Sequence, residues 1–163
     1  MTASSALCTK CGLCCDGTFL DRAPLEAGEL DWATKHRLPL LSRGETTGFT
    51  LPCVLLKERQ CSSYETRPAV CRAYQCELLK GVLAGAVALA DAERLVATVQ
   101  GLAAQVRAEG LLDKAEAIFG PKTAERSAQA SVDWLLNLGG LKSLVDRHFR
   151  RPEPTESARE PSG

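Results

Sequence analysis

Four cysteines stand within eight residues near the N-terminus, in the run Cys8-Thr-Lys-Cys11-Gly-Leu-Cys14-Cys15. Four more follow at Cys53, Cys61, Cys71 and Cys76. No cysteine occurs after residue 76, so all eight belong to the first half of the chain. Cysteines that served only to pack a core would be scattered more widely. The clustering therefore indicates that the first half folds around a thiolate site.

The spacing of Cys8, Cys11 and Cys14 indicates metal binding. Zinc sites use CxxC turns in pairs, whereas three in tandem match the first three cysteines of the bacterial ferredoxin run that binds a 4Fe–4S cluster. The Cys-Pro that closes that run is absent, because Asp16 follows Cys15. A cluster would need its fourth ligand from a later cysteine. Two four-cysteine zinc sites or a binuclear site are equally open, and adjacent Cys14 and Cys15 cannot easily direct both sulfurs to one metal.

The sequence favours a reducing, cytoplasmic setting. Residues 1–7 carry no basic stretch or apolar segment typical of a leader, and the longest apolar run, near Gly81–Ala90, is too short to span a bilayer. We therefore expect neither export nor a membrane partner. Because structural disulfides are rare in the cytosol, eight cysteines favour metal or cluster binding. A thiol–disulfide redox protein is the alternative.

Charge bears on two further expectations. Lys+Arg and Asp+Glu both number 20, so the chain lacks the basic excess of a nucleic-acid-binding protein and no such partner is expected. Four thiolates exceed the charge of Zn²⁺ or of an oxidised cubane by two. Arg67 and Arg72 each precede a cysteine by four residues, and on a helix each pair would share a face. We expect both arginines to contact the cofactor; the alternative is a solvated helix surface.

Local patterns predict how the first half is organised. Residues 8–15 are expected to form tight turns rather than a helix, and a helix is expected over about 24–36. The stretch 49–61 predicts a hairpin that returns Cys61 towards Cys53. A helix should begin near Pro68 and distort or stop near Cys76.

The sequence pattern of the second half predicts helices. Leu95, Val99, Leu102 and Val106 predict one helix with Asp91 as N-cap and Gly110 as its end. Further helices are expected over 111–119 and 122–138, the latter with Val132, Leu135 and Leu136 inward. A break at Gly139-Gly140 and a last short helix follow. The predicted fold class is α+β: a metal-nucleated cysteine-cluster module over residues 1–80, a helical region over 81–150 and a disordered tail over 151–163.

These motifs together resemble the CxxCxxCC cysteine-cluster proteins, the YkgJ-like family, which is associated with chelation of zinc or iron. The resemblance is carried by the run Cys8 to Cys15, by the acidic stretch around Glu26 and Glu29, by Pro52-Cys53, and by Cys61-Ser-Ser-Tyr-Glu-Thr-Arg-Pro-Ala-Val-Cys71-Arg-Ala-Tyr-Gln-Cys76. It covers about residues 6–77 and fills all eight cysteine positions, so it implies that all eight serve a metal site.

Flagellin lysine methylases contain a related cysteine cluster and are associated with an iron–sulfur centre. This likeness favours an iron–sulfur cluster, 4Fe–4S, over Zn²⁺. It does not imply methylation, because no S-adenosylmethionine-binding pattern is visible. No catalytic constellation accompanies the cysteines, so no enzymatic reaction is assigned. We expect a protein that binds a metal ion or a cluster and serves electron transfer, metal handling or support of a protein-modification enzyme. Its expected partners are the metal or cluster and a second protein. The alternative is a structural zinc module that mediates protein interaction.

Overall fold

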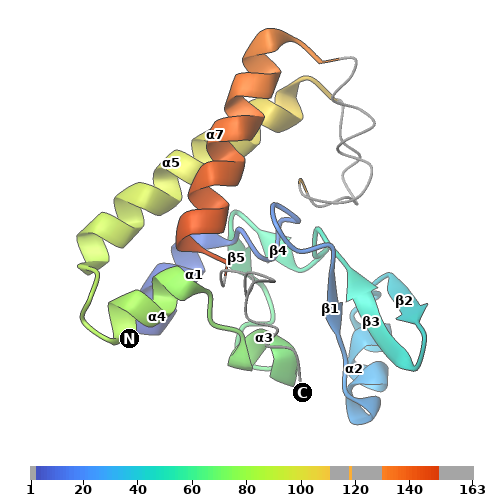
Figure 1. Cartoon of the computed structure of the whole chain (residues 1–163). Helices are drawn as coiled ribbons and strands as arrows, with labels where there is room; N and C mark the ends of the chain where they lie inside the picture. Colours follow the sequence, from blue (N-terminus) through green and yellow to red (C-terminus); the bar gives the residue numbers. More distant parts are fainter. Residues whose placement is uncertain (1–2, 111–117, 119–129, 151–163) are drawn as a thin grey trace, which may run out of the picture.

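The computed structural model describes residues 3–110, Ile118 and residues 130–150. It has the predicted α+β character, with small antiparallel sheets in the first half and two long helices, α5 and α7, in the second. In Figure 1 the two long helices lie side by side at one end of the molecule, and the three-stranded sheet with α2 lies at the other. Helices α1, α3 and α4 and the hairpin β4–β5 lie between them.

A three-stranded antiparallel sheet, in the order β1-β3-β2, forms the outer part of the first half. Its strands are β1 (Arg22–Pro24), β2 (Leu40–Arg43) and β3 (Thr46–Thr50). Between β1 and β2 run the 3-10 helix η1 (Ala27–Glu29) and α2 (Leu30–Lys35). Gly48 is required at the centre of β3, because a Cβ there would lie 2.4 Å from the carbonyl oxygen of Ala23.

The predicted hairpin is present as β4 (Leu56–Lys57) paired with β5 (Gln60–Cys61). Lys57 lies opposite Gln60, so Glu58 and Arg59 form the loop, and both have positive φ, 46° and 68°. Two-residue hairpin loops favour this left-handed backbone because its twist matches that of the strands.

Helix α3 (Ala69–Ala73) begins directly after Pro68 and ends before Cys76, as predicted. Proline suits the start of a helix because it has no N–H to leave unpaired. After three extended residues the chain resumes as α4 (Glu77–Leu83), with Cys76 at its N-cap. The interruption places Cys71 within α3 and Cys76 at the N-cap of α4.

Two predictions for the first half are wrong. Residues 8–11 are helical, not a loop: they end α1 (Ala3–Cys11), which is anchored by the buried side chain of Leu7, and the tight turns begin only at Gly12. The helix expected over 24–36 is shortened to α2, because pairing of β1 with β3 holds the chain extended up to Pro24.

Helices α5 (Leu89–Ala108) and α7 (Val132–His148) form the helical part. Of the four side chains that predicted α5, Val99 and Val106 are buried and Leu95 and Leu102 are partly buried. The predicted N-cap is wrong, because the helix begins directly after Ala88 and Asp91 lies in its first turn. Helix α7 runs unbroken through Gly139-Gly140, so the predicted break is wrong. Glycine costs a helix about 1 kcal/mol relative to alanine, and burial of the helix face against α5 offsets this.

The predicted inward face of α7 is also wrong. Val132, Leu135 and Leu136 are exposed by 72%, 44% and 68%. The buried side chains are instead Trp134, Leu138, Leu141 and Val145, which recur at spacings of three and four along one helix face. Three other predictions fall outside the described residues: the helix over 111–119, except for Ile118, the first part of the helix over 122–138, and the tail over 151–163.

One hydrophobic core joins the two halves of the described chain. Leu7, Leu13 and Phe19 from the cysteine-rich part belong to the same buried cluster as Val99 of α5 and Trp134 of α7. A second, smaller cluster lies under the sheet and contains Ala33, Leu38, Phe49 and Leu51. None of the described helices is long and apolar enough to cross a membrane.

Candidate metal centre

All eight cysteines line a single cavity of about 300 Å³, which we call the cysteine cavity. Each is a free thiol, and all but the exposed Cys8 are buried or partly buried. They reach the cavity from six parts of the fold: α1, the turns after it, the loop before β4, strand β5, helix α3 and the N-cap of α4. The sequence-predicted set is therefore gathered in one place.

Helices α1 and α4 form one wall of the cavity. Cys8 and Cys11 are three residues apart on α1, so they share a helix face. Helix α1 packs against α4, which brings Cys76 alongside them. After α1 the chain turns at Gly12, whose φ is +65° and whose carbonyl accepts hydrogen bonds from the N–H groups of Cys15 and Asp16, each at 2.9 Å.

The hairpin and α3 form the opposite wall. The N–H of Cys53 donates to the carbonyl of Cys15 at 2.8 Å, which ties the loop before β4 to the vicinal pair. The Cys53 carbonyl accepts from the N–H of Leu56 at 3.0 Å, and Leu56 lies opposite Cys61 in the hairpin. Cys71 comes from α3 and packs with Cys53 against the second hydrophobic cluster.

Burial makes most of these thiols hard to ionise on their own. It raises the pKa of Cys11 and of Cys71 to about 12, and the negative charges of neighbouring cysteines act in the same direction. Burial likewise raises the pKa of Cys53 to about 11 and shifts those of Cys8 and Cys76 upwards. Several thiolates could share this cavity only if a cation offset their charge.

The vicinal pair behaves differently. The hydrogen bond between the Cys14 and Cys15 side chains raises the pKa of Cys14 and lowers that of Cys15. The positive charge of Arg67 also favours the Cys15 thiolate. Within this pair, Cys15 therefore ionises more easily than Cys14.

Arg67 lies over the ring of Tyr64, with its guanidinium carbon 3.6 Å from the ring centroid. Its Nε donates to the Cys71 carbonyl at 3.4 Å, and a further N–H donates to the Tyr64 carbonyl. Its positive charge partly offsets the increase that burial causes in the pKa of Cys8 and Cys71, and it favours the Cys15 thiolate. The exposed Arg72 also lines the cavity, and its guanidinium donates to the carbonyl of Arg67.

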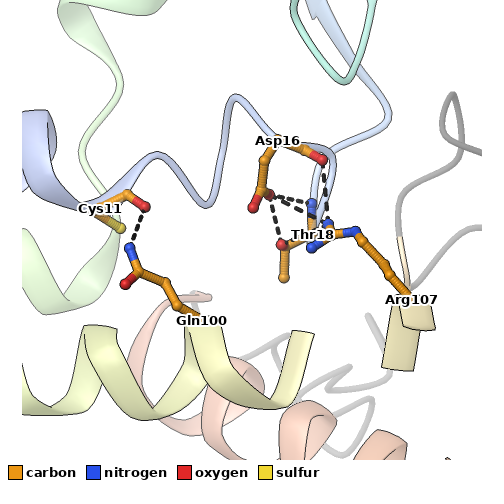
Figure 2. A network of polar contacts seen from close by, with 5 residues as sticks. All are labelled: Cys11, Asp16, Thr18, Gln100 and Arg107. Atoms are coloured by element: carbon orange, nitrogen blue, oxygen red, sulfur yellow. Dashed lines mark hydrogen bonds and ion pairs between the residues drawn. The ribbon is translucent and has the colours of Figure 1, made fainter. Parts of the chain in front are cut away.

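Residues that the sequence did not single out hold the cysteine-bearing turns in place. From α5, the Nε2 of Gln100 donates to the Cys11 carbonyl at 2.7 Å (Figure 2). It also donates to the Lys10 carbonyl at 2.9 Å. About two turns later on α5, Arg107 donates to the Asp16 carbonyl at 3.2 Å and to the Thr18 hydroxyl at 2.9 Å. No local pattern marks these residues, because each acts across about ninety positions of sequence.

Glu29 supports α3 in a similar way. One of its carboxylate oxygens accepts from the N–H of Ala69 at 2.6 Å and so satisfies a free donor of the first turn of α3. The other accepts from the N–H of Glu26 at 3.0 Å. The acidic stretch noted in the sequence thus positions the helix that carries Cys71.

The donor set fits zinc or iron, because thiolates are the soft ligands that both accept. Among the described residues, no three Cys, His, Asp or Glu side chains are already gathered closely enough to hold a metal ion. Neither His36 nor His148 is among the residues that line the cavity. Binding of zinc or iron would therefore depend on the eight thiols and on a cation that offsets the charge of their thiolates.

Comparison with protein families agrees with this chemistry. Residues 7–94 match the family model CxxCxxCC, described as a putative zinc- or iron-chelating domain. The chain belongs to the CxxCxxCC family. The CxxCxxCC match includes all eight cysteines and extends beyond the cysteine-bearing segments into α5. Searches of curated proteins and of solved structures returned no match.

Proposed function

We propose that the cysteine cavity is a thiolate centre for iron or zinc, with a 4Fe–4S cluster as the favoured occupant. The observation that carries the proposal is that eight cysteines from six parts of the fold line one cavity. A redox protein would need only one adjacent pair. Cysteines used as core residues would be separated from one another.

The chain's own residues would prepare the cavity for such a group. Arg67 offsets thiolate charge, and the apolar side chains of Leu7, Phe19 and Leu79, which line the cavity, would limit the access of water. Gln100 and Arg107 hold the backbone of the turns, so the thiols keep their relative positions. When bound, a cluster would supply one-electron redox chemistry, and zinc would supply structural stability alone.

Two observations favour an iron–sulfur cluster over zinc as the occupant of the cavity. Cys8, Cys11 and Cys14 have the spacing of three cubane ligands, and a cubane distributes the charge of its thiolates over four irons. We further propose a cytosolic setting, where thiols stay reduced. There the centre would serve electron transfer, metal handling or support of a protein-modification enzyme. A structural zinc module that mediates protein contacts is the second candidate, supported by the same thiols.

Anaerobic purification followed by elemental analysis, assay of acid-labile sulfide and a visible spectrum tests this proposal. We expect brown protein that contains iron and sulfide. Colourless protein with stoichiometric zinc and no sulfide would instead establish the zinc module. Metal-free protein with ordered near-UV circular dichroism would contradict both, and reversible dithiol–disulfide cycling of that protein would establish the redox alternative.

A further inference from the structure

We propose that the eight cysteines form two neighbouring four-thiolate centres, which divide between Cys14 and Cys15. The first set is Cys8, Cys11, Cys14 and Cys76. The second set is Cys15, Cys53, Cys61 and Cys71. This inference rests on the proposed function, because it assigns the ligands within the same cysteine cavity.

The first set is held by the main hydrophobic core. Cys11 is part of that core, and Cys14 and Cys76 pack against it. Cys8 is attached to Cys11 through a shared face of α1, and the packing of α1 on α4 brings Cys76 to that face. In agreement with this grouping, the charge of Cys76 contributes to the raised pKa of each of the other three.

The second set is held by the hairpin, α3 and the smaller hydrophobic cluster. Cys53 and Cys71 pack against that cluster. A backbone hydrogen bond from the Cys53 N–H to the Cys15 carbonyl brings Cys15 to the same wall. The hairpin pairs Leu56 with Cys61 and so brings Cys61 there as well. The charges of Cys15, Cys53 and Cys61 all contribute to the raised pKa of Cys71.

The vicinal pair is the natural point of division. Adjacent side chains diverge from the backbone, so Cys14 and Cys15 serve one metal with difficulty and two metals readily. Their own hydrogen bond, together with the influence of Cys15 on Cys8, shows that the two sets are neighbours. Arg67 lines the same cavity, and its charge acts on Cys8 of the first set and on Cys15 and Cys71 of the second, so both sets share it.

The two sets also differ in pattern. The first combines three cysteines in CxxCxxC spacing with one distant cysteine, which is the ligand arrangement of one cluster in two-cluster ferredoxins. The second draws one cysteine from each of four segments, as a four-thiolate centre assembled by tertiary structure would. The two centres can therefore be emptied separately.

Three double variants, each lacking two thiols, test the division. Cys11→Ala/Cys76→Ala removes two members of the first set, Cys53→Ala/Cys71→Ala removes two of the second, and Cys71→Ala/Cys76→Ala removes one of each. After anaerobic purification, native mass spectrometry counts bound metal and sulfide. We expect each within-set variant to lose one of the two centres found in the wild type, and the across-set variant to lose both.

A single shared centre would instead make all three variants lose metal alike, and that result would overturn the division. So would a wild-type protein with one centre, although the proposed function would stand. Wild-type protein without metal would overturn the function itself and the division with it.

Stepwise chelation of wild-type protein provides a measurement that does not depend on the folding of variants. Cysteines that are freed at half-loading are alkylated and identified by mass spectrometry. Labels that fall on the four members of one set would support the division. Labels drawn equally from both sets at half-loading would overturn it.

Discussion

Arg67 is the arginine whose positive charge acts on three thiols of the cysteine cavity, Cys8, Cys15 and Cys71. Its guanidinium is fixed by the Tyr64 ring and by backbone carbonyls, so it does not have to be ordered when a cofactor binds. Arg72 is exposed, and its guanidinium bonds to the backbone of Arg67 rather than to a thiol-bearing residue. The two arginines, predicted as equivalent from their spacing, therefore differ in their surroundings.

Replacing Arg67 should weaken metal retention more than replacing Arg72. We expect Arg67→Leu to lower metal affinity by about 10–100-fold, as is typical for partners of metal ligands, and Arg67→Lys to lose less because it keeps the charge. Arg72→Leu is the matched control. Competition against a chromophoric chelator measures the affinities, and wild-type retention in Arg67→Leu would show that its charge does not act on the centre.

At the scale of elements, α5 is the support on which the cysteine-bearing turns rest. Helix α1 ends at Cys11, so its last carbonyls lack partners within the helix. Gln100 supplies donors to two of them, and Arg107 holds the turn that follows through Asp16 and the fully buried Thr18. Figure 2 shows both side chains reaching from α5 to this segment.

Loss of the Gln100 amide should destabilise the protein. Gln100→Leu leaves two carbonyls without a donor, and we expect about 1–3 kcal/mol lower free energy of unfolding. Gln105→Leu is the matched control, because Gln105 is exposed on the same helix. Urea unfolding under anaerobic conditions measures both. Equal stability of the two variants would mean that water replaces the Gln100 bonds without loss.

The glycines of α7 and β3 should respond in opposite directions to alanine. A Cβ at Gly139 would meet nothing within 4 Å, so Gly139→Ala should stabilise the unbroken helix by about 0.5–1 kcal/mol. Gly48→Ala should destabilise the sheet, because its Cβ would overlap the Ala23 carbonyl. Thermal unfolding compares the two, and a destabilising Gly139→Ala would argue that α7 is interrupted there after all.

At the scale of the whole molecule, metal chemistry and ordinary packing occupy different regions but share a core. All the cysteines precede residue 77, whereas the buried Trp134, Leu141 and Val145 belong to α7. The eight thiols of the first part come from six segments that a bound metal would join, so we expect a metal to contribute more to the stability of this part. The boundary placed at residue 80 remains a prediction, and Leu7, Leu13 and Phe19 pack across it.

Removal of the metal should loosen the two parts unequally. After chelation, we expect amide hydrogen exchange to increase in the hairpin, in α3 and in residues 12–18, because the thiols there lose the metal that binds them to other segments. Exchange in α5 and α7 should change little, since Trp134 remains packed and its indole N–H still donates to the Val106 carbonyl at 2.6 Å. Hydrogen-exchange mass spectrometry measures this, and uniform loosening would contradict the two-part division.

Much of the site could be predicted from the sequence because its signals are local. The spacing of Cys8, Cys11 and Cys14 identifies thiolate chemistry over a few residues. Pro68 marks the start of α3 for the same reason, since proline acts on its immediate neighbours. The hairpin that carries Cys61 follows from its extended residues and polar turn.

Contacts between distant segments determined the helix boundaries and the positions of the cysteines, which no short segment specifies. Helix α1 continues through Cys11 because Leu7 is buried and Gln100, about ninety residues away, satisfies its last carbonyls. Helix α7 passes through Gly139-Gly140 because packing against α5 outweighs the low helix propensity of glycine. Which cysteines share a wall of the cavity depends on the packing of α1 on α4 and of α3 on the sheet. Residue type and spacing determined the chemistry of the site, and contacts between distant segments determined its geometry.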